Sequence, residues 1–171
     1  MKKHKKYWWL PLLLIVCSAL ANAQKNAEKT RIQVLRAAEV KVVDGDSLYL
    51  GKKEIRLSGI DAPEYHQTCF DARGHEYACG KKSFEVLKSL AGSDIRCKTV
   101  AKDKYKRYVS VCESGGVDIN KKMVENGWAV AYKRYTHDYD EAEMLAKRQK
   151  RGIWQGRFMK PELYRILNKS K

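Results

Sequence analysis

The feature of this sequence that most constrains its fold is an alternation of β-branched and polar residues from Arg31 to Ile60. Two turn signals, Asp44-Gly45 and Gly51-Lys52, interrupt the alternation at the spacing of hairpins. A meander returns the ends of its strands to one neighbourhood, so polar residues at these ends can meet. The pattern predicts a three-stranded meander, with strands over 32–43, 46–50 and 53–60.

A helix and a second hairpin are expected after the meander. Apolar residues recur every three positions from Phe84 to Leu90, and a glycine follows as a stop, which predicts a helix over 80–91. The next two segments, 94–100 and 107–112, predict a hairpin whose connection is basic and polar.

The last part of the chain predicts three more helices. Asp118 can cap a helix that ends at Gly127. A second helix is expected over 138–151, and Pro161 opens a short third one. Five strands with inserted and appended helices favour an α+β fold, a five-stranded OB-type antiparallel β-barrel with three to four helices.

The N-terminal 23 residues have the form of a secretory signal peptide. Four lysines and no acidic residue precede an apolar run from Tyr7 to Leu20, and Ala21-Asn22-Ala23 follows as a cleavage site. The run is shorter than the ~20 residues that a spanning helix needs, which favours cleavage after Ala23 over an uncleaved anchor. Cleavage of a lipoprotein before Cys17 is a further, less favoured alternative.

The rest of the chain is expected to be a polar tether over 24–31 and a single domain over 32–171. The net charge of the whole chain is +15, and the domain stays strongly basic after the four lysines of the signal are removed. A basic domain favours a polyanionic partner. We expect an exported monomer, periplasmic or secreted, without stable membrane insertion after cleavage.

Four cysteines lie beyond the signal peptide: Cys69, Cys79, Cys97 and Cys112. An even number of cysteines in an exported chain favours disulfides. Of the three possible connectivities, we favour the pairing of the first two cysteines and of the last two. The alternative is a zinc site, in which His66 and His75 join the first two cysteines.

Acidic residues gather at the predicted ends of the meander strands. Asp44-Gly45-Asp46 and Asp61-Ala62-Pro63-Glu64 flank the strand that carries Arg56. Clustered carboxylates repel one another, so a fold that keeps them together usually binds a cation between them. The donors are hard oxygens without histidine or cysteine, which favours calcium, with magnesium as the alternative.

A basic segment, Lys102–Arg107, occupies the turn of the later hairpin. It can recognise phosphate, because an arginine fork binds two phosphate oxygens at once, or it can be a solvated loop. Tyr105 and Tyr132 can stack on bases, although Tyr132 can equally be a half-buried core residue.

Six segments, in this order and spacing, resemble the staphylococcal nuclease (thermonuclease) family. The resemblance covers the chain from about Val40 to Gln155. It implies an exported, calcium-dependent endonuclease that hydrolyses DNA and RNA with little sequence specificity and leaves 3′-phosphate ends. The alternative is a catalytically inactive barrel that binds nucleic acid or another polyanion. The segments are Asp44-Gly45-Asp46, Arg56-Leu57, Asp61-Ala62-Pro63-Glu64, Asp103-Lys104-Tyr105-Lys106-Arg107, Asn126-Gly127-Trp128-Ala129 and Gly152-Ile153-Trp154.

The resemblance also implies the metal ligands and the general base. Asp46 and Asp61 match the calcium carboxylates of the family, and Ala62 matches a position that offers its backbone carbonyl to the metal. Alanine replaces the threonine of the founding member, which keeps this carbonyl. Glu64 matches the general base.

Five more residues match positions that contact the substrate. Arg56 and Arg107 match the two arginines that grip the scissile phosphate. Lys104 and Tyr105 match positions that bind a neighbouring phosphate, and Tyr132 matches a tyrosine of the nucleotide pocket. The complete set of carboxylates and arginines favours an enzyme over a binding module.

Two departures from the family pattern lie beside the expected site. Lys106 stands where a glycine is common before the arginine, so the turn that aims this arginine is expected to differ. An insertion between Tyr65 and Gly80 contains the first cysteine pair and is expected to shape access to the site.

Overall fold

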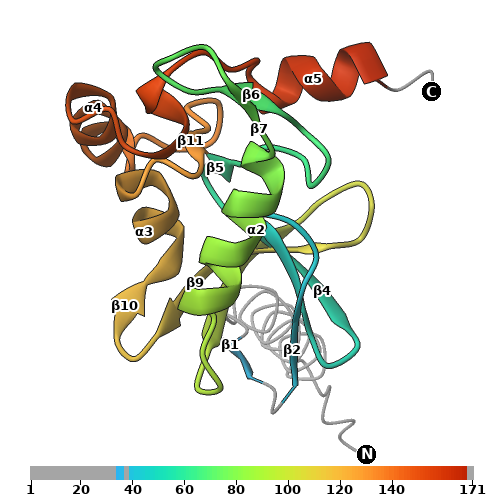
Figure 1. Ribbon diagram of the computed structural model, residues 1–171. Coiled ribbons are helices and arrows are strands. Elements are labelled where there is room, and N and C mark those ends of the chain that lie inside the picture. The colour runs from blue at the N-terminus through green and yellow to red at the C-terminus, as the bar shows by residue number, and fades with distance from the viewer. Residues whose placement is uncertain (1–33, 37–38, 169–171) are drawn as a thin grey trace, which may run out of the picture. The chain divides into compact units, whose positions relative to one another are not determined.

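The computed structural model describes residues 34–36 and 39–168 (Figure 1). The predicted signal peptide and tether lie outside the described residues. The strands are β1 (Val34–Arg36), β2 (Val40–Val42), β3 (Ser47–Leu50), β4 (Lys53–Leu57), β5 (Ile60–Asp61), β6 (Cys69–Phe70), β7 (Glu76–Tyr77), β8 (Arg96–Lys102), β9 (Tyr108–Ser114), β10 (Val117–Asp118) and β11 (Val130–Ala131). The helices are α2 (Cys79–Leu90), α3 (Ile119–Glu125), α4 (Asp140–Arg148), α5 (Pro161–Asn168) and the short 3-10 helix η1 (Gly152–Gln155).

The main sheet has seven strands in the order β1-β8-β9-β4-β3-β2, with β10 paired to β9. β1 and β2 stand at the two ends of this order, yet only three residues of the chain separate them. The two edges of the sheet therefore lie close together, and the sheet curls into a partly open barrel. The prediction of an OB-type α+β fold is confirmed.

The strand boundaries correct two predictions. The single strand expected over 32–43 is divided into β1 and β2, which pair with different partners, β8 and β3. The strand expected over 53–60 ends at Leu57, and the separate β5 pairs with β11 instead. The alternation of apolar and polar residues shows only which face of a strand is buried. It therefore cannot show that one stretch of sequence is divided into two strands with different partners.

One pairing in the sheet, β4 with β9, is parallel. The sequence predicted an antiparallel barrel, since strands joined by hairpins are antiparallel. β4 and β9 are instead joined by a long crossover that contains α2 and β8, as a parallel pair requires. The register sets Arg56 opposite Val109, next to the basic turn that precedes β9.

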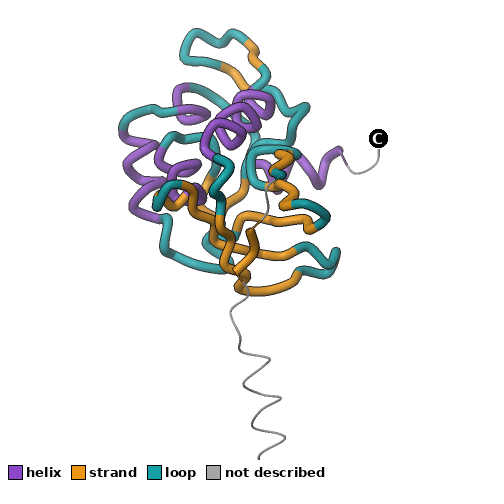
Figure 2. Tube along the Cα trace, turned by 90° about the horizontal axis from the view of Figure 1, so that it is seen from below, coloured by secondary structure: helices purple, strands orange, loops and turns teal. Residues whose placement is uncertain are grey.

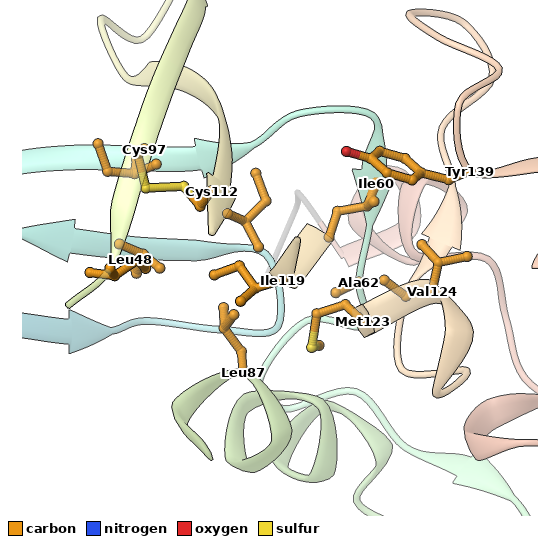
Figure 3. Packing of buried hydrophobic residues seen from close by; sticks show 14 of the residues in the cluster. Leu48, Ile60, Ala62, Leu87, Cys97, Cys112, Ile119, Met123, Val124 and Tyr139 are labelled. Carbon is orange, nitrogen blue, oxygen red and sulfur yellow. A yellow bond between two sulfur atoms is a disulfide. The ribbon is translucent and has the colours of Figure 1, made fainter. Parts of the chain in front are cut away.

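The helices α2 and α3 cover the core on one side of the barrel (Figures 1 and 3). Cys79, Ser83 and Leu87 recur at intervals of four along α2 and form its buried face. Figure 3 shows Leu87 directed toward Ile119 and Met123 of α3. The predicted helix over 80–91 is confirmed within one residue at each end.

The ends of α3 follow local signals in the sequence. The Asp118 carboxylate accepts a hydrogen bond from the backbone N–H of Lys121, 2.9 Å away, so the predicted cap is confirmed. Gly127 ends the helix with a φ of 72°. A side chain there would also clash with the backbone carbonyl of Arg151, so only glycine fits.

Asn120 of α3 joins the helix to the barrel. Its side chain is fully buried, and its Nδ2 donates to the carbonyls of Ser58 and Ser110 at 2.9 and 3.1 Å. Its Oδ1 accepts from the backbone N–H of Cys112 at 3.0 Å. A buried amide with these partners fixes the end of β4 beside β9, because each group left unpaired would cost about 1–3 kcal/mol.

The last two helices lie apart from each other (Figures 1 and 2). α4 is shorter than the predicted 138–151 helix, because the chain turns at Lys150 and Gly152, both at positive φ. α5 begins at Pro161, as predicted, and extends away from the other helices. Among the described residues, no helix combines the length and the apolar character needed to cross a membrane.

Two disulfides, Cys69–Cys79 and Cys97–Cys112, match the pairing that the sequence favoured. The first joins β6 to the first residue of α2, and the second joins directly opposite residues of β8 and β9 (Figure 3). A disulfide leaves neither sulfur as a thiolate for zinc, so the structure favours disulfides over the zinc alternative.

Candidate active site

The turn between β2 and β3 places an aspartate in the interior. Asp44 Oδ1 accepts a hydrogen bond from the backbone N–H of Asp46 at 3.0 Å, which is a local turn typical of aspartate. A side chain at Gly45 would clash with Ser83 of α2 and with the Ala62 methyl group. Because α2 packs so closely on this turn, Asp46 is only 1% exposed.

Arg56 joins the two buried aspartates. It projects from β4, where it stands opposite Ser47 in the register with β3. One guanidinium nitrogen donates to Asp46 Oδ1, and Nη2 donates to Asp61 Oδ1 at 2.8 Å. Asp61 is 2% exposed and lies in β5, which is paired with β11. The two carboxylates therefore converge on one guanidinium group.

The second oxygen of Asp46 is held by the backbone. Asp46 Oδ2 accepts from the N–H of Ala62 at 2.7 Å, and Ser47 Oγ donates to Asp46 Oδ1 at 3.1 Å. The hydrogen bond from Ala62 ties the β2–β3 turn to the segment that follows β5. The carboxylates of Asp46 and Asp61 are thus fixed by backbone geometry as well as by Arg56.

Further arginines lie close to Arg56. Burial lowers the pKa of Arg56; the charges of Asp61 and Asp44 raise this pKa, and those of Arg165 and Arg107 lower it. Burial also raises the pKa of the Asp44 carboxyl, against the lowering effect of Arg56 and Arg107. The charges of Arg165 and Arg107 therefore act on Arg56, and those of Arg56 and Arg107 act on Asp44.

Glu64 follows β5 in a turn that packs against the start of α2. Its backbone N–H donates to Gln67 Oε1 at 3.2 Å, and its carbonyl accepts from the Gln67 N–H at 2.7 Å. A side chain at Gly80 would clash with the same Glu64 carbonyl. The Glu64 side chain remains 33% exposed, so solvent can reach its carboxylate.

Arg107 is aimed by the turn between β8 and β9. Asp103 Oδ1 accepts from the Arg107 backbone N–H at 3.0 Å, and Asp103 Oδ2 accepts from Arg107 Nε at 2.8 Å. Lys106 adopts a φ of 69°, the left-handed conformation that glycine adopts most easily. The turn that glycine would favour is therefore formed by lysine.

Arg165 of α5 enters the same group of acids. Its Nη2 lies 2.8 Å from Asp61 Oδ1, and its Nη1 donates to Glu64 Oε1 at 2.9 Å. Burial alone would lower the pKa of Arg165, but the hydrogen bond to Glu64 and the charge of Asp61 raise it above its ordinary value. One guanidinium group thus connects Asp61 with Glu64.

Aromatic residues lie at two other places. Tyr105 is 63% exposed at the tip of the β8–β9 turn, with Lys104 Nζ 5.0 Å from its ring centroid. Tyr132 follows β11, and its hydroxyl donates to Glu162 Oε1 of α5 at 3.0 Å. The Tyr135 ring lies 5.2 Å from the Tyr132 ring and is largely exposed.

The structure places the predicted site residues in three groups. Four of them form one hydrogen-bonded group, Arg56, Asp46, Asp61 and Ala62, to which Glu64 is linked through Arg165. Arg107, Lys104 and Tyr105 share the β8–β9 turn, whereas Tyr132 lies beside α5. Sequence reasoning missed Arg165 and Glu162, and the only available signal was the position of both on the polar side of an amphipathic segment.

The donor atoms of the two buried aspartates indicate which kind of metal ion they could bind. Within the described part of the chain, no cluster of three or more His, Cys, Asp and Glu side chains has the arrangement of a metal site. Asp46 and Asp61 nevertheless offer two buried carboxylates that already converge on a cationic group. Two hard carboxylate oxygens, with a backbone carbonyl and water, fit a hard dication better than a transition metal.

Comparison with known proteins shows which sequences this chain resembles. Residues 54–156 match the family described as staphylococcal nuclease homologue. An uncharacterized endonuclease of Haemophilus influenzae is 33% identical over 153 residues, which is 85% of this chain and 76% of that protein. The succinoglycan biosynthesis protein ExoI of Rhizobium meliloti is 36% identical over 68% of this chain and 63% of its own length. The endonuclease YhcR of Bacillus subtilis is 35% identical over 67% of this chain, which spans 11% of that protein.

Proposed function

The chain belongs to the staphylococcal nuclease family, and from this premise we propose that it is an exported, calcium-dependent endonuclease. It hydrolyses phosphodiester bonds of DNA and RNA with little sequence specificity and leaves 3′-phosphate ends. The observation that carries the proposal is the convergence of Asp46 and Asp61 on the guanidinium of Arg56, with Glu64 beside them. Two relatives that are named endonucleases support it.

Asp46 and Asp61 would hold the calcium ion through their carboxylates, and Ala62 would contribute its backbone carbonyl. Bound there, the ion cancels the repulsion between these acids and a phosphodiester and stabilises the charge that develops in the transition state. The backbone hydrogen bond from Ala62 to Asp46 supports this assignment, because it fixes one ligand segment against the other.

Glu64 is the proposed general base. Its carboxylate is the most exposed of the three acids assigned to the site, so it can reach a water molecule that the buried aspartates cannot. It orients this water and accepts its proton, a contribution typically worth about 10²–10⁴-fold in rate. The Gln67 and Gly80 contacts support the role, because they fix the backbone from which Glu64 projects.

Arg56 and Arg107 donate hydrogen bonds to the oxygens of the scissile phosphate, and Lys104 and Tyr105 bind a neighbouring phosphate. Tyr132 contributes to the nucleotide pocket. Loss of one such fixed donor commonly raises a barrier by about 3–4 kcal/mol. Broad specificity follows from charge and stacking surfaces that contact backbone and base faces rather than base edges.

Export rests on the N-terminal sequence and on the cysteines. The signal peptide over residues 1–23 would be removed, leaving a monomer in the periplasm or outside the cell. The two disulfides support an oxidising compartment, because cytosolic reductants would keep these thiols reduced.

The direct test incubates the purified protein with plasmid DNA and with RNA, in calcium and in a calcium chelator. We expect both substrates to be degraded in calcium only, and activity to return when calcium is restored. Products should become primers for a polymerase only after phosphatase treatment, because their 3′ ends carry phosphate. Asp61→Asn should abolish degradation, whereas Asp138→Asn, an exposed aspartate, should not.

The outcomes separate the candidate functions. Degradation that persists unchanged in chelator would remove the metal role of Asp46 and Asp61. Retention of nucleic acid without degradation in any cation would identify a binding module instead.

A further inference from the structure

The C-terminal helix α5 contacts both ends of the candidate active site. Arg165 lies within 2.9 Å of Asp61 and Glu64, the proposed metal ligand and general base. Glu162, three positions earlier on the same helix, accepts the hydrogen bond from Tyr132 and lies 3.5 Å from Arg134. Residues three apart face the same side of a helix, so one face of α5 covers the acids and the nucleotide tyrosine together.

These polar contacts account for much of the attachment of α5. Pro161 is the only buried residue in the helix, and the apolar side chains of Leu163, Ile166 and Leu167 are 47%, 58% and 56% exposed. A helix of eight residues is not stable by itself in water, so α5 depends on its docking contacts. Few buried apolar contacts also mark the segments that open most easily.

Arg165 occupies the atoms that the proposed chemistry needs. Asp61 Oδ1 accepts from Arg56 and from Arg165, and Glu64 Oε1 accepts from Arg165. An oxygen held by two guanidinium groups has little capacity left for a dication, and the Glu64 oxygen that accepts from Arg165 is less free to accept a hydrogen bond from a water molecule. A dication beside Asp61 would also repel the Arg165 charge.

Glu162 presents the opposite charge at the other end. The Glu162 side chain is 43% exposed, and its carboxylate stands against Tyr132 and Arg134, where the proposed function places an anionic strand. α5 thus offers a cation to the acids and an anion to the nucleotide side. This matches the charges of the metal ion and of the nucleic acid, respectively.

We propose that α5 is an autoinhibitory segment, which closes the active site through Arg165 and Glu162 and is displaced by the divalent cation and an anionic strand. The inference rests on the proposed function, since it assumes that Asp61 and Glu64 belong to a working site. When calcium is scarce, the closed state predominates and the protein does not act on its substrate. When calcium binds Asp61, Arg165 is released and α5 separates from the acids.

Calcium titration calorimetry tests the competition directly. Arg165→Gln removes the guanidinium, and Arg148→Gln removes the same charge from the exposed end of α4 as a matched control. We expect Arg165→Gln to bind calcium about three- to tenfold more tightly than the wild-type protein. Only the open fraction of the wild-type protein can bind calcium, so its apparent affinity is reduced in proportion to that fraction. Arg148→Gln should bind like the wild type.

Hydrogen exchange gives a readout that depends on neither activity nor the Arg165 substitution. On addition of calcium to the wild-type protein, the amides of α5 should exchange faster, while those of α3 keep their protection. Glu162→Gln should bind a short single-stranded oligonucleotide more tightly in chelator, since it removes the anion that competes with phosphate.

The results distinguish the two proposals. If calorimetry detects no heat of calcium binding for the wild-type protein or either variant, the assignment of the metal site is wrong and both proposals fail. If all bind calcium with equal affinity, or α5 becomes more protected in calcium, the proposed nuclease function survives and the autoinhibitory role of α5 is overturned.

Discussion

Asp103 holds Arg107 at two points, its backbone N–H at 3.0 Å and its side-chain Nε at 2.8 Å. The two carboxylate oxygens each take one of these bonds, so the position of the arginine and its direction are fixed together. The remaining guanidinium nitrogens, Nη1 and Nη2, are then available to a phosphate. The turn is a support for a ligand-binding arginine as well as a connection between strands.

Replacement of Asp103 by Asn should lower turnover by about ten- to a hundredfold, because a misaimed catalytic group costs about this much. Asn keeps an oxygen for the backbone N–H but loses the charge that faces Nε. Steady-state kinetics on a single-stranded substrate should show the loss mainly in kcat.

Asp94→Asn is the matched control for this substitution. Asp94 accepts from Ser114 Oγ and from the Gly115 N–H, both at 3.0 Å, at the opposite end of the β8–β9 hairpin. It should leave kcat unchanged. Equal losses in both variants would mean that the hairpin is merely destabilised.

Stability in acid should depend on the same carboxylate. Burial works to raise the pKa of Asp103, but the hydrogen bonds and charge of Arg107 hold the pKa below its ordinary value. A lowered folded-state pKa contributes stability that is present above the unfolded value of about 3.9 and is lost as the pH falls through the folded value. As the pH falls below about 4, the free energy of unfolding should therefore decrease more steeply for the wild-type protein than for Asp103→Asn, which urea unfolding at a series of pH values measures. Parallel curves would contradict this.

Glu64→Gln should lower turnover by about 10²–10⁴-fold, because the amide cannot accept a proton from water. Binding of an oligonucleotide in chelator should be retained, since the amide keeps the size of the side chain and an acceptor for Arg165. Glu85→Gln, on the exposed side of α2, is the control. A nearly fully active Glu64→Gln variant would remove this residue as the base.

Lys106→Gly should stabilise the protein or leave its stability unchanged. Lys106 adopts a φ of 69°, which costs a residue with a side chain roughly 1–2 kcal/mol. Glycine relieves this cost but has more freedom to lose on folding, so we expect a net gain of up to about 1 kcal/mol in the free energy of unfolding. Lys104→Gly, in the same turn without a positive φ, should be neutral or destabilising. A clear loss of stability in Lys106→Gly would show that the lysine side chain stabilises the turn.

Thiol titration of the exported protein, unfolded without reductant, should find no free thiol. The two disulfides consume four cysteines, and the remaining Cys17 lies in the predicted signal peptide. Detection of one thiol per chain would indicate that the signal peptide is retained. More than one would show that a disulfide is missing.

Local patterns in the sequence predicted a large part of the fold, because they report local physics. The Asp118 cap, the buried face of α2 and the hairpins were all readable, since each depends on residues within a few positions. The short strands β6, β7 and β11 were not predicted, because two residues are too few to show an alternation. Their pairing depends on distant segments.

The candidate site divides in the same way. Asp46, Asp61 and Glu64 are predicted from the sequence because acids gather there at the ends of the meander strands together with an arginine and match a family pattern. Arg165 was missed, because a lone arginine on an amphipathic helix is normally a solvated surface charge. Only the tertiary position of α5 brings its guanidinium within reach of residues a hundred positions earlier in the chain.

Arg56 and Arg107 become neighbours only when β4 pairs with β9, and the crossover between these strands contains α2 and β8. Closing so long a loop costs entropy before any contact is gained, so we expect this pairing to form late in folding. We expect a nascent polypeptide that stops before the β8–β9 turn to lack Arg107 and the strand that pairs with β4. Under the proposed function, such an incomplete chain would be inert toward nucleic acid, and hydrolysis would begin only once this part of the chain has been made and folded.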